Sequence, residues 1–118
     1  PNLKKGKIVI SDRYADSSFV YQGYVNKFGI KKAQKLHKEL LNNFFPDYTF
    51  IFKINPKEII KRLKQRKVKN KYDKSNILFH QNVIQGYKKI TTPKRYITVD
   101  ASLSKEIIHK NIIKKLKL

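Results

Sequence analysis

Residues 7–18 read Lys7-Ile8-Val9-Ile10-Ser11-Asp12-Arg13-Tyr14-Ala15-Asp16-Ser17-Ser18. The apolar, β-branched run over 7–11 predicts a short buried strand that ends at Asp12. Asp16 and Ser17 then offer N-cap chemistry for a helix that continues to Tyr24. A buried strand that passes directly into a helix is the repeating unit of α/β proteins, so this stretch sets the expected fold class.

The rest of the chain repeats this alternation. After a break at Phe28-Gly29, a helix with leucines at helical spacing follows, and Pro46-Asp47 closes it. The later segments predict, in order, a strand over 49–54, a helix that Asn55 caps with Pro56 at its first position, a helix around 79–87, a strand over 95–99 and an amphipathic helix from 107. Residues 65–74 lose the apolar periodicity and are mostly basic or Asn, which predicts a mobile, solvated segment.

Three short strands joined by helical crossovers predict an α/β fold, in which a parallel sheet carries helices on both faces. No internal repeat, low-complexity tract or second domain interrupts the chain, so residues 1–118 are expected to belong to one domain. The sequence contains no Met, even at position 1, and we therefore expect that an N-terminal piece precedes these residues.

The composition excludes several classes of protein. Hydrophobic residues make up 40% of the 118 residues, which is enough apolar material to fold. The absence of Cys excludes a disulfide framework and a thiol nucleophile, and three widely spaced His exclude a metal site built on His and Cys. No apolar stretch approaches the roughly 20 residues that span a bilayer.

The charge is strongly basic, with 28 Lys and Arg against 8 Asp and Glu, a net charge of +20. Such an excess favours a nucleic-acid-binding module as an alternative function, because Lys-rich surfaces gain affinity by releasing counterions. Only four of the basic residues are Arg, and the Lys are spread over every predicted element. Lys, Ile and Asn share AT-rich codons, so biased coding explains the charge more simply, and nucleic-acid binding is expected to be incidental at most.

Candidate chemistry gathers where the predicted strands end. Ligands of open parallel sheets bind beyond the carboxyl ends of the strands, an edge that would carry Asp12-Arg13, Asn55-Pro56 and Asp100-Ala101. An acid there can hold Mg²⁺ through water, and an adjacent Arg can clamp a phosphoryl oxygen, the two requirements of phosphoryl transfer. Taken without context, Asp12-Arg13 would instead be an ordinary ion pair at a strand end.

The helix that follows offers groups for a base. Ser18, Tyr21 and Gln22 project from neighbouring turns, because residues three and four apart share a face. Their hydroxyl, aromatic and amide groups would suit a pyrimidine. The alternatives are core packing for Tyr21 and Phe19, which we favour for Phe19, and a helix cap for Ser17.

The string from Asp12 to Gly23, DRYADSSFVYQG, closely resembles the signature of the thymidylate kinase family, in which Asp-Arg-Tyr or Asp-Arg-His precedes Ser-Ser and Tyr-Gln-Gly. The similarity continues to the C-terminus. It is carried by Pro46-Asp47, Asn55-Pro56, Asn70-Lys71-Tyr72-Asp73, Phe79-His80, Gly86-Tyr87, Arg95-Tyr96 and Asp100-Ala101. Tyr21-Gln22-Gly23 argues against the remaining alternative, a kinase for another nucleoside monophosphate.

The resemblance implies a P-loop NTPase fold in three layers and a cytoplasmic enzyme, a homodimer when complete, that transfers the γ-phosphoryl group of ATP to dTMP with Mg²⁺ and gives dTDP. Asp12 would hold Mg²⁺ through water and Arg13 would contact the phosphates being joined, while Ser18, Tyr21 and Gln22 would bind dTMP. A lid at about 65–74 would close over ATP. Arg66 and Lys71 would be its cations, with Asp100 and Ala101 near the adenine.

Three departures from the family pattern qualify this expectation. Lys71 stands where the family usually has Arg and loses bidentate geometry, and Asp73 replaces an acid often found as Glu. No stretch matches the phosphate loop G-x-x-x-x-G-K-[ST]. In the family, the strand that precedes this loop comes first in the chain. In the sheet, it lies between the strand that ends at Asp12 and the strand that starts near Thr49. We therefore expect these residues to form the C-terminal portion of the kinase domain, inactive alone and marginally stable.

Overall fold

The computed structural model describes residues 1–65, 77–91 and 94–117. Its elements, in chain order, are a 3₁₀ turn Leu3–Lys5, α1 Ala15–Ser18, η2 Phe19–Val25, α2 Ile30–Leu41, β1 Thr49–Lys53, α3 Pro56–Gln65, α4 Ile77–Ile90, β2 Tyr96–Asp100 and α5 Lys105–Leu116. The predicted alternation of helices and strands is therefore confirmed from residue 15 onward.

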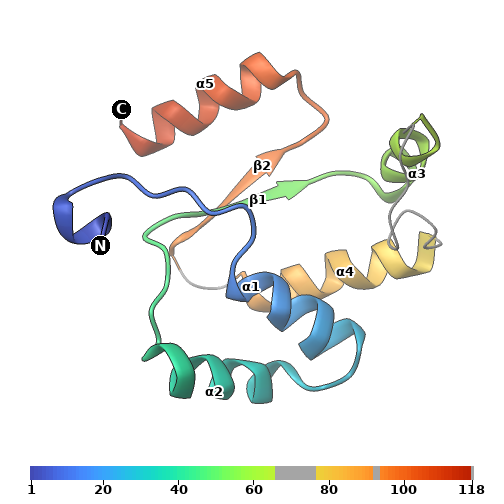
Figure 1. Cartoon of the computed structure of the whole chain (residues 1–118). Helices are drawn as coiled ribbons and strands as arrows, with labels where there is room; N and C mark the ends of the chain where they lie inside the picture. The colour runs from blue at the N-terminus through green and yellow to red at the C-terminus, as the bar shows by residue number, and fades with distance from the viewer. Residues whose placement is uncertain (66–76, 92–93, 118) are drawn as a thin grey trace.

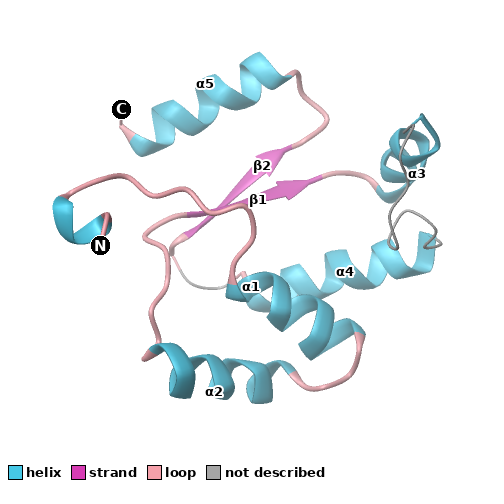
Figure 2. Ribbon diagram, in the orientation of Figure 1, coloured by secondary structure: helices cyan, strands magenta, loops and turns pink. Residues whose placement is uncertain are grey.

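The two strands lie parallel and side by side. Thr49 is opposite Tyr96, and the register continues without a break to Lys53 opposite Asp100. α3 and α4 make the crossover between the strands, as a parallel pair requires. Figure 1 shows α5 on one side of the strand pair and α1, α2 and α4 on the other, and Figure 2 gives the same view coloured by secondary structure. The α/β class is thus confirmed, with two strands paired in the described residues.

The predicted strand over 7–11 was wrong. These residues pass in front of the two strands in Figure 1 but pair with neither, and Ile8, Val9 and Ile10 are 72%, 52% and 92% exposed. An apolar β-branched run has the local preference for a strand, but a strand forms only where a neighbour satisfies its backbone groups and covers its side chains. No described segment does this for 7–11.

The hydrophobic core surrounds η2, which continues α1 and packs against α2 and α4. Phe19 and Val20 are 2% and 0% exposed, so the expected core position of Phe19 is confirmed. η2 has the wider π-helical winding, in which the Asn26 N–H reaches back five residues to the Tyr21 carbonyl at 2.9 Å. The break at Phe28-Gly29 is also confirmed, since Gly29 takes φ +102°, a left-handed conformation that suits glycine.

The helix ends match the sequence in part. Asn55 caps α3 as expected, its Oδ1 accepting the Lys57 N–H at 2.9 Å. The caps expected from Asp16 and Ser17 were wrong, because Tyr14 is the N-cap residue of α1 and its side chain makes no capping bond. α2 ends at Leu41, before Pro46-Asp47, because Asn42 turns left-handed at φ +47°.

None of the helices in the described ranges is both long and apolar enough to cross a membrane.

Gly86 provides a test of the packing between η2 and α4. A Cβ at this position would lie 2.8 Å from Val20 Cγ1 and 3.0 Å from Tyr24 Cδ1, so Gly86→Ala forces the two helices apart. We expect the free energy of unfolding to fall by about 1–3 kcal/mol, more than offsetting the better helix propensity of Ala. Urea unfolding measures this, with Gln85→Ala on the exposed face of α4 as the control. Equal stability of the two variants would contradict the close approach.

Candidate functional site

Arg13 precedes α1 and is held in an unusual backbone conformation. Its φ is +70°, a left-handed value that a residue with a Cβ rarely adopts, and the Ser11 hydroxyl donates to its carbonyl at 2.9 Å. Its side chain turns back over the helix, where Nε donates to Ser17 Oγ at 3.1 Å and Cζ lies 4.7 Å from the centre of the Tyr21 ring. Within the described residues no protein group binds its two terminal amino groups, so the outer side of the guanidinium remains available.

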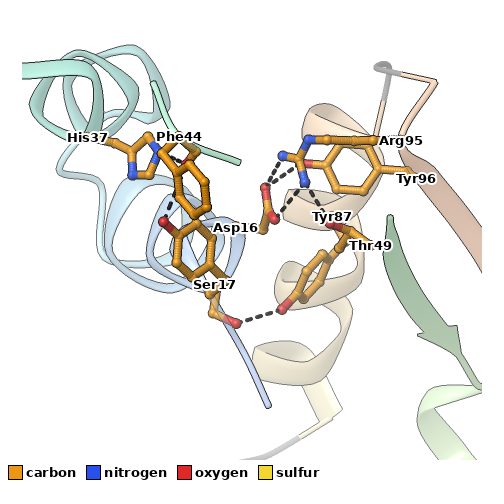
Figure 3. Close-up of polar contacts among 9 residues, drawn as sticks. Asp16, Ser17, His37, Phe44, Thr49, Tyr87, Arg95 and Tyr96 are labelled. Carbon is orange, nitrogen blue, oxygen red and sulfur yellow. Dashed lines mark hydrogen bonds and ion pairs between the residues drawn. The ribbon is translucent and has the colours of Figure 1, made fainter. Parts of the chain in front are cut away.

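Helix α4 contacts both residues that hold the Arg13 side chain. The Ser17 hydroxyl lies 3.3 Å from the Tyr87 hydroxyl, a contact drawn in Figure 3, and the Tyr21 ring packs 6.1 Å from the ring of Phe79. The predicted cap role of Ser17 was wrong: its hydroxyl joins Arg13 to α4. Tyr21 is half-buried beneath the guanidinium, so it both packs and presents a ring to the site.

Asp12 is exposed, and its carboxylate has no hydrogen-bond or ion-pair partner in the described part of the chain. The interpretation of Asp12-Arg13 as an ordinary ion pair was therefore wrong. The described residues contain no cluster of three or more His, Asp or Glu that could hold a metal ion. Asp12 remains available as a single oxygen ligand, the kind of donor that suffices for Mg²⁺ when phosphates and water complete its shell.

A buried ion pair, which no motif in the sequence predicted, fixes the start of α1 to the strands. Asp16 is 4% exposed, and both of its oxygens accept from Arg95, from Nη2 at 2.6 Å and from Nη1 at 3.0 Å. Arg95 Nη1 also donates to Thr49 Oγ1 at 2.6 Å and Nη2 to the Tyr96 hydroxyl at 2.6 Å, and that hydroxyl donates to Asp16 Oδ1. Figure 3 shows the carboxylate and the guanidinium facing each other.

Aromatic rings complete the surroundings of Arg95. Its Cζ lies 4.5 Å from the Phe45 ring centre and 4.1 Å from that of Tyr96. Burial opposes the charge of Arg95, but the hydrogen bond and the negative charge of Asp16 raise the pKa of the guanidinium above its ordinary value. Burial and the adjacent Asp16 carboxylate raise the pKa of Tyr96 well above its ordinary value.

The opposite side of the helix borders a cavity of about 580 Å³ between η2 and α2. Ser18 and Gln22, one helical turn apart, provide polar groups to its wall, and Leu36 and Leu40 of α2 provide apolar ones. His37, a buried residue, is also part of its wall, with Nε2–H donating to the Phe44 carbonyl at 2.9 Å. The predicted base-binding residues therefore divide between two sides of one helix: Ser18 and Gln22 line the cavity, and Tyr21 lies under Arg13.

Asp100 and Ala101 lie at the other end of the strand pair. Asp100 Oδ1 accepts from the N–H and hydroxyl of Ser102 at 2.9 and 2.7 Å, and these bonds lower the pKa of the carboxyl group. Ala101 N–H donates to the Lys53 carbonyl at the carboxyl end of β1. Asp16, by contrast, is bound to Arg95, which in turn donates to Thr49, at the amino ends of both strands, about 13 Å away for strands of this length. The structure thus does not gather Asp100 and Ala101 with the Arg13 cluster.

Almost all of the predicted lid lies outside the described residues. Arg66 and Lys71 lie in the range 66–76, outside the described residues, and of the segment 65–74 only Gln65 is described, as the last residue of α3. Asn55, which was expected at the ligand edge of the sheet, has its side-chain oxygen engaged in capping α3.

Comparison with known proteins agrees with the motifs. The family model described as thymidylate kinase matches residues 1–112. Among curated proteins, the thymidylate kinase of Staphylococcus epidermidis is 41% identical over 124 aligned positions, covering 99% of this chain and 61% of that protein. The thymidylate kinase of Mycoplasma mobile is 41% identical over 96% of the chain, and that of Bacillus velezensis 38% over 92%. The chain spans 56% and 53% of these last two proteins.

The hydroxyl of Tyr96 predicts a specific response to alkaline pH. Because its pKa is raised by folding, the unfolded chain loses this proton first, near pH 10, and the folded state loses stability as pH rises further. Below pH 10 the contribution is fully present. We expect the stability of Tyr96→Phe to fall less steeply between pH 10 and 11.5 than that of the unchanged chain, measured by urea unfolding relative to pH 8. Tyr48→Phe, at an exposed tyrosine, should retain the steeper decline.

Proposed function

The chain belongs to the thymidylate kinase family, and from this premise we propose that its residues serve the ATP-dependent phosphorylation of dTMP to dTDP. In this reaction the bond between the β- and γ-phosphoryl groups of ATP breaks. A phosphate oxygen of dTMP forms a bond to the γ-phosphorus, and ADP leaves. The chain covers little more than half the length of its relatives, so the proposal concerns the part that these residues play.

The observation that carries the proposal is the guanidinium of Arg13. It is held from one side by Ser17 and Tyr21, and no other group in the described part of the chain binds its terminal amino groups. A planar fork with a fixed orientation matches a phosphoryl group and binds it with paired, charge-assisted hydrogen bonds. We assign Arg13 to the phosphates being joined, where negative charge is redistributed during transfer.

Ser18 and Gln22 provide the proposed contacts to the thymine. A hydroxyl and an amide at the wall of a mostly apolar cavity can bind the polar edge of a pyrimidine, and the apolar side chains of α2 can cover its faces. Tyr21, on the Arg13 side, is the proposed contact to the sugar. One helix would then provide contacts both to the base and to the sugar of the nucleotide.

Asp12 is the proposed anchor for Mg²⁺ through water, since its exposed carboxylate is not engaged by the described protein groups. When bound, the ion supplies positive charge that shields the phosphates from each other. Arg66 and Lys71 are the proposed lid cations, and Asp100 and Ala101 the proposed neighbours of the adenine. These four assignments rest on the family resemblance alone.

We further propose that the partner of the complete enzyme is a second copy of itself. The resemblance implies a homodimer. Nucleic acid is not proposed as a partner.

A coupled assay of ADP release tests the proposed activity. These 118 residues alone contain no phosphate-loop motif, so we expect no turnover above background. A version extended to the length of the relatives should phosphorylate dTMP in preference to UMP and GMP. Turnover equal to that without an acceptor would reject the function, and a preference for UMP or GMP would reject the substrate.

Arg13→Ala in the extended version tests the assignment of the guanidinium. We expect kcat to fall about 100-fold or more, with a much smaller change in the KM for dTMP, because the interaction strengthens as charge develops. Arg62→Ala is the matched control, since Arg62 pairs with Glu58 at 3.1 Å on the exposed surface of α3. Equal losses in kcat/KM and in dTMP affinity would mean that Arg13 only anchors the substrate.

A further inference from the structure

We propose that the buried Asp16–Arg95 pair is a positioning device for Arg13, so that a contact with the strands sets the geometry of the phosphate-binding guanidinium. The inference rests on the proposed function only for what Arg13 does. The structural link between the two sites stands on its own contacts. Asp16 and Arg95 touch no substrate in this proposal and act through Arg13.

Asp16 is held firmly by its partners. Both carboxylate oxygens are engaged by Arg95, and Oδ1 also accepts from the Tyr96 hydroxyl. Arg95 is in turn fixed by Thr49 at the start of β1 and lies against the rings of Phe45 and Tyr96. Asp16 is therefore bound to a rigid group that belongs to the sheet.

The path along the chain from Asp16 to Arg13 is short. The two residues are three positions apart, with extended Tyr14 between them as the N-cap of α1. Ser17, the partner of Arg13 Nε, follows Asp16 directly in the same turn. A shift of that turn moves the Ser17 hydroxyl and the Tyr21 ring, the two groups that orient the guanidinium.

The backbone conformation of Arg13 also depends on the residues around it. A left-handed φ of +70° is unfavourable for any residue with a Cβ, and it persists only where the surroundings hold it. Ser11 restrains the carbonyl of Arg13 on one side. On the other side the described structure provides the ion pair at Asp16 and the hydrogen bond from the Tyr14 hydroxyl to Phe44 at 3.3 Å. Without the ion pair, we infer that the residues before α1 relax toward an ordinary conformation.

Asp16→Asn tests the link in the chain of 118 residues, because it removes the charge and preserves the size of the side chain. Arginine Nε–H signals in ¹H–¹⁵N NMR spectra report on Arg13 directly. We expect its signal to move toward the position of a solvent-exposed arginine and its hydrogen exchange to quicken about tenfold, since a displaced partner no longer protects it. The signal of Arg62 should not change.

Glu58→Gln is the matched control, an acid-to-amide change that breaks an exposed ion pair to an arginine. It should shift the Arg62 signal and leave that of Arg13 unchanged. If Asp16→Asn unfolds the chain, Tyr96→Phe serves in its place: it removes one hydrogen bond to Asp16, retains the charge pair, and should shift the Arg13 signal in the same direction by less. An unaltered Arg13 signal in a folded variant overturns the proposal.

A kinetic cycle in the extended version separates positioning from a purely structural role. Asp16→Asn should lower kcat about tenfold with little change in the KM for dTMP, because a catalytic group held in the wrong position accelerates the reaction less. Added to Arg13→Ala, it should lower kcat no further, because the group that it positions is already absent. A full additional tenfold loss overturns the proposal. Absence of dTMP phosphorylation in the extended version rejects the proposed function instead, and the NMR result still decides the link between Asp16 and Arg13.

Discussion

The ion pair between Asp16 and Arg95 joins parts of the chain that are 79 residues apart, and the arrangement around α1 depends on it. Taking two charges out of water is costly, and the cost is repaid only where geometry and hydrogen bonding are nearly complete. Here the carboxylate receives a two-pronged contact, and the two terminal nitrogens of Arg95 also donate to Thr49 and Tyr96. These contacts join the start of α1 to the amino ends of both strands.

The orientation of α1 gives one short helix two different sides. Ser17 and Tyr21 are joined to α4 and form the support on which Arg13 lies. Ser18 and Gln22, one position further along in each case, belong to the wall of the cavity shared with α2. A rotation of the helix by one residue would move Ser17 and Tyr21 away from α4 and Ser18 and Gln22 away from their place on the cavity wall, so the angle at which α1 begins determines which residues face each side.

The sequence predicted elements whose stability is local. The leucine spacing of α2, the Asn55-Pro56 start of α3 and the β-branched run of β2 each contain their own signal, and the structure confirms all three. Sequence reasoning failed where the deciding partner is distant. The run at 7–11 has strand composition but no neighbouring strand in the described structure, and Asp16 has cap composition but a stronger partner in Arg95.

The candidate site divides in the same way. Arg13, Ser18 and Gln22 were identified from a contiguous motif, because one string of twelve residues contains all three, with Arg13 just before the helix and the other two one helical turn apart. The supports of that motif, Tyr87 and Arg95, come from other helices and strands, and no local spacing indicates which residues they contact. A motif specifies the chemistry of a site, whereas its rigidity comes from tertiary contacts that the motif does not contain.

The exposed run at Ile8, Val9 and Ile10 also affects how the chain behaves in solution. An exposed, apolar, β-branched segment that pairs with no strand in the described ranges can add to a strand edge of another molecule, which is the usual first contact in aggregation. Repulsion between copies that each carry a net charge of +20 opposes this encounter, and Lys5 and Lys7 place part of that charge beside the run. Salt shortens the range of this repulsion to about 10 Å at 0.1 M, so concentrated solutions of the chain are best kept at low ionic strength.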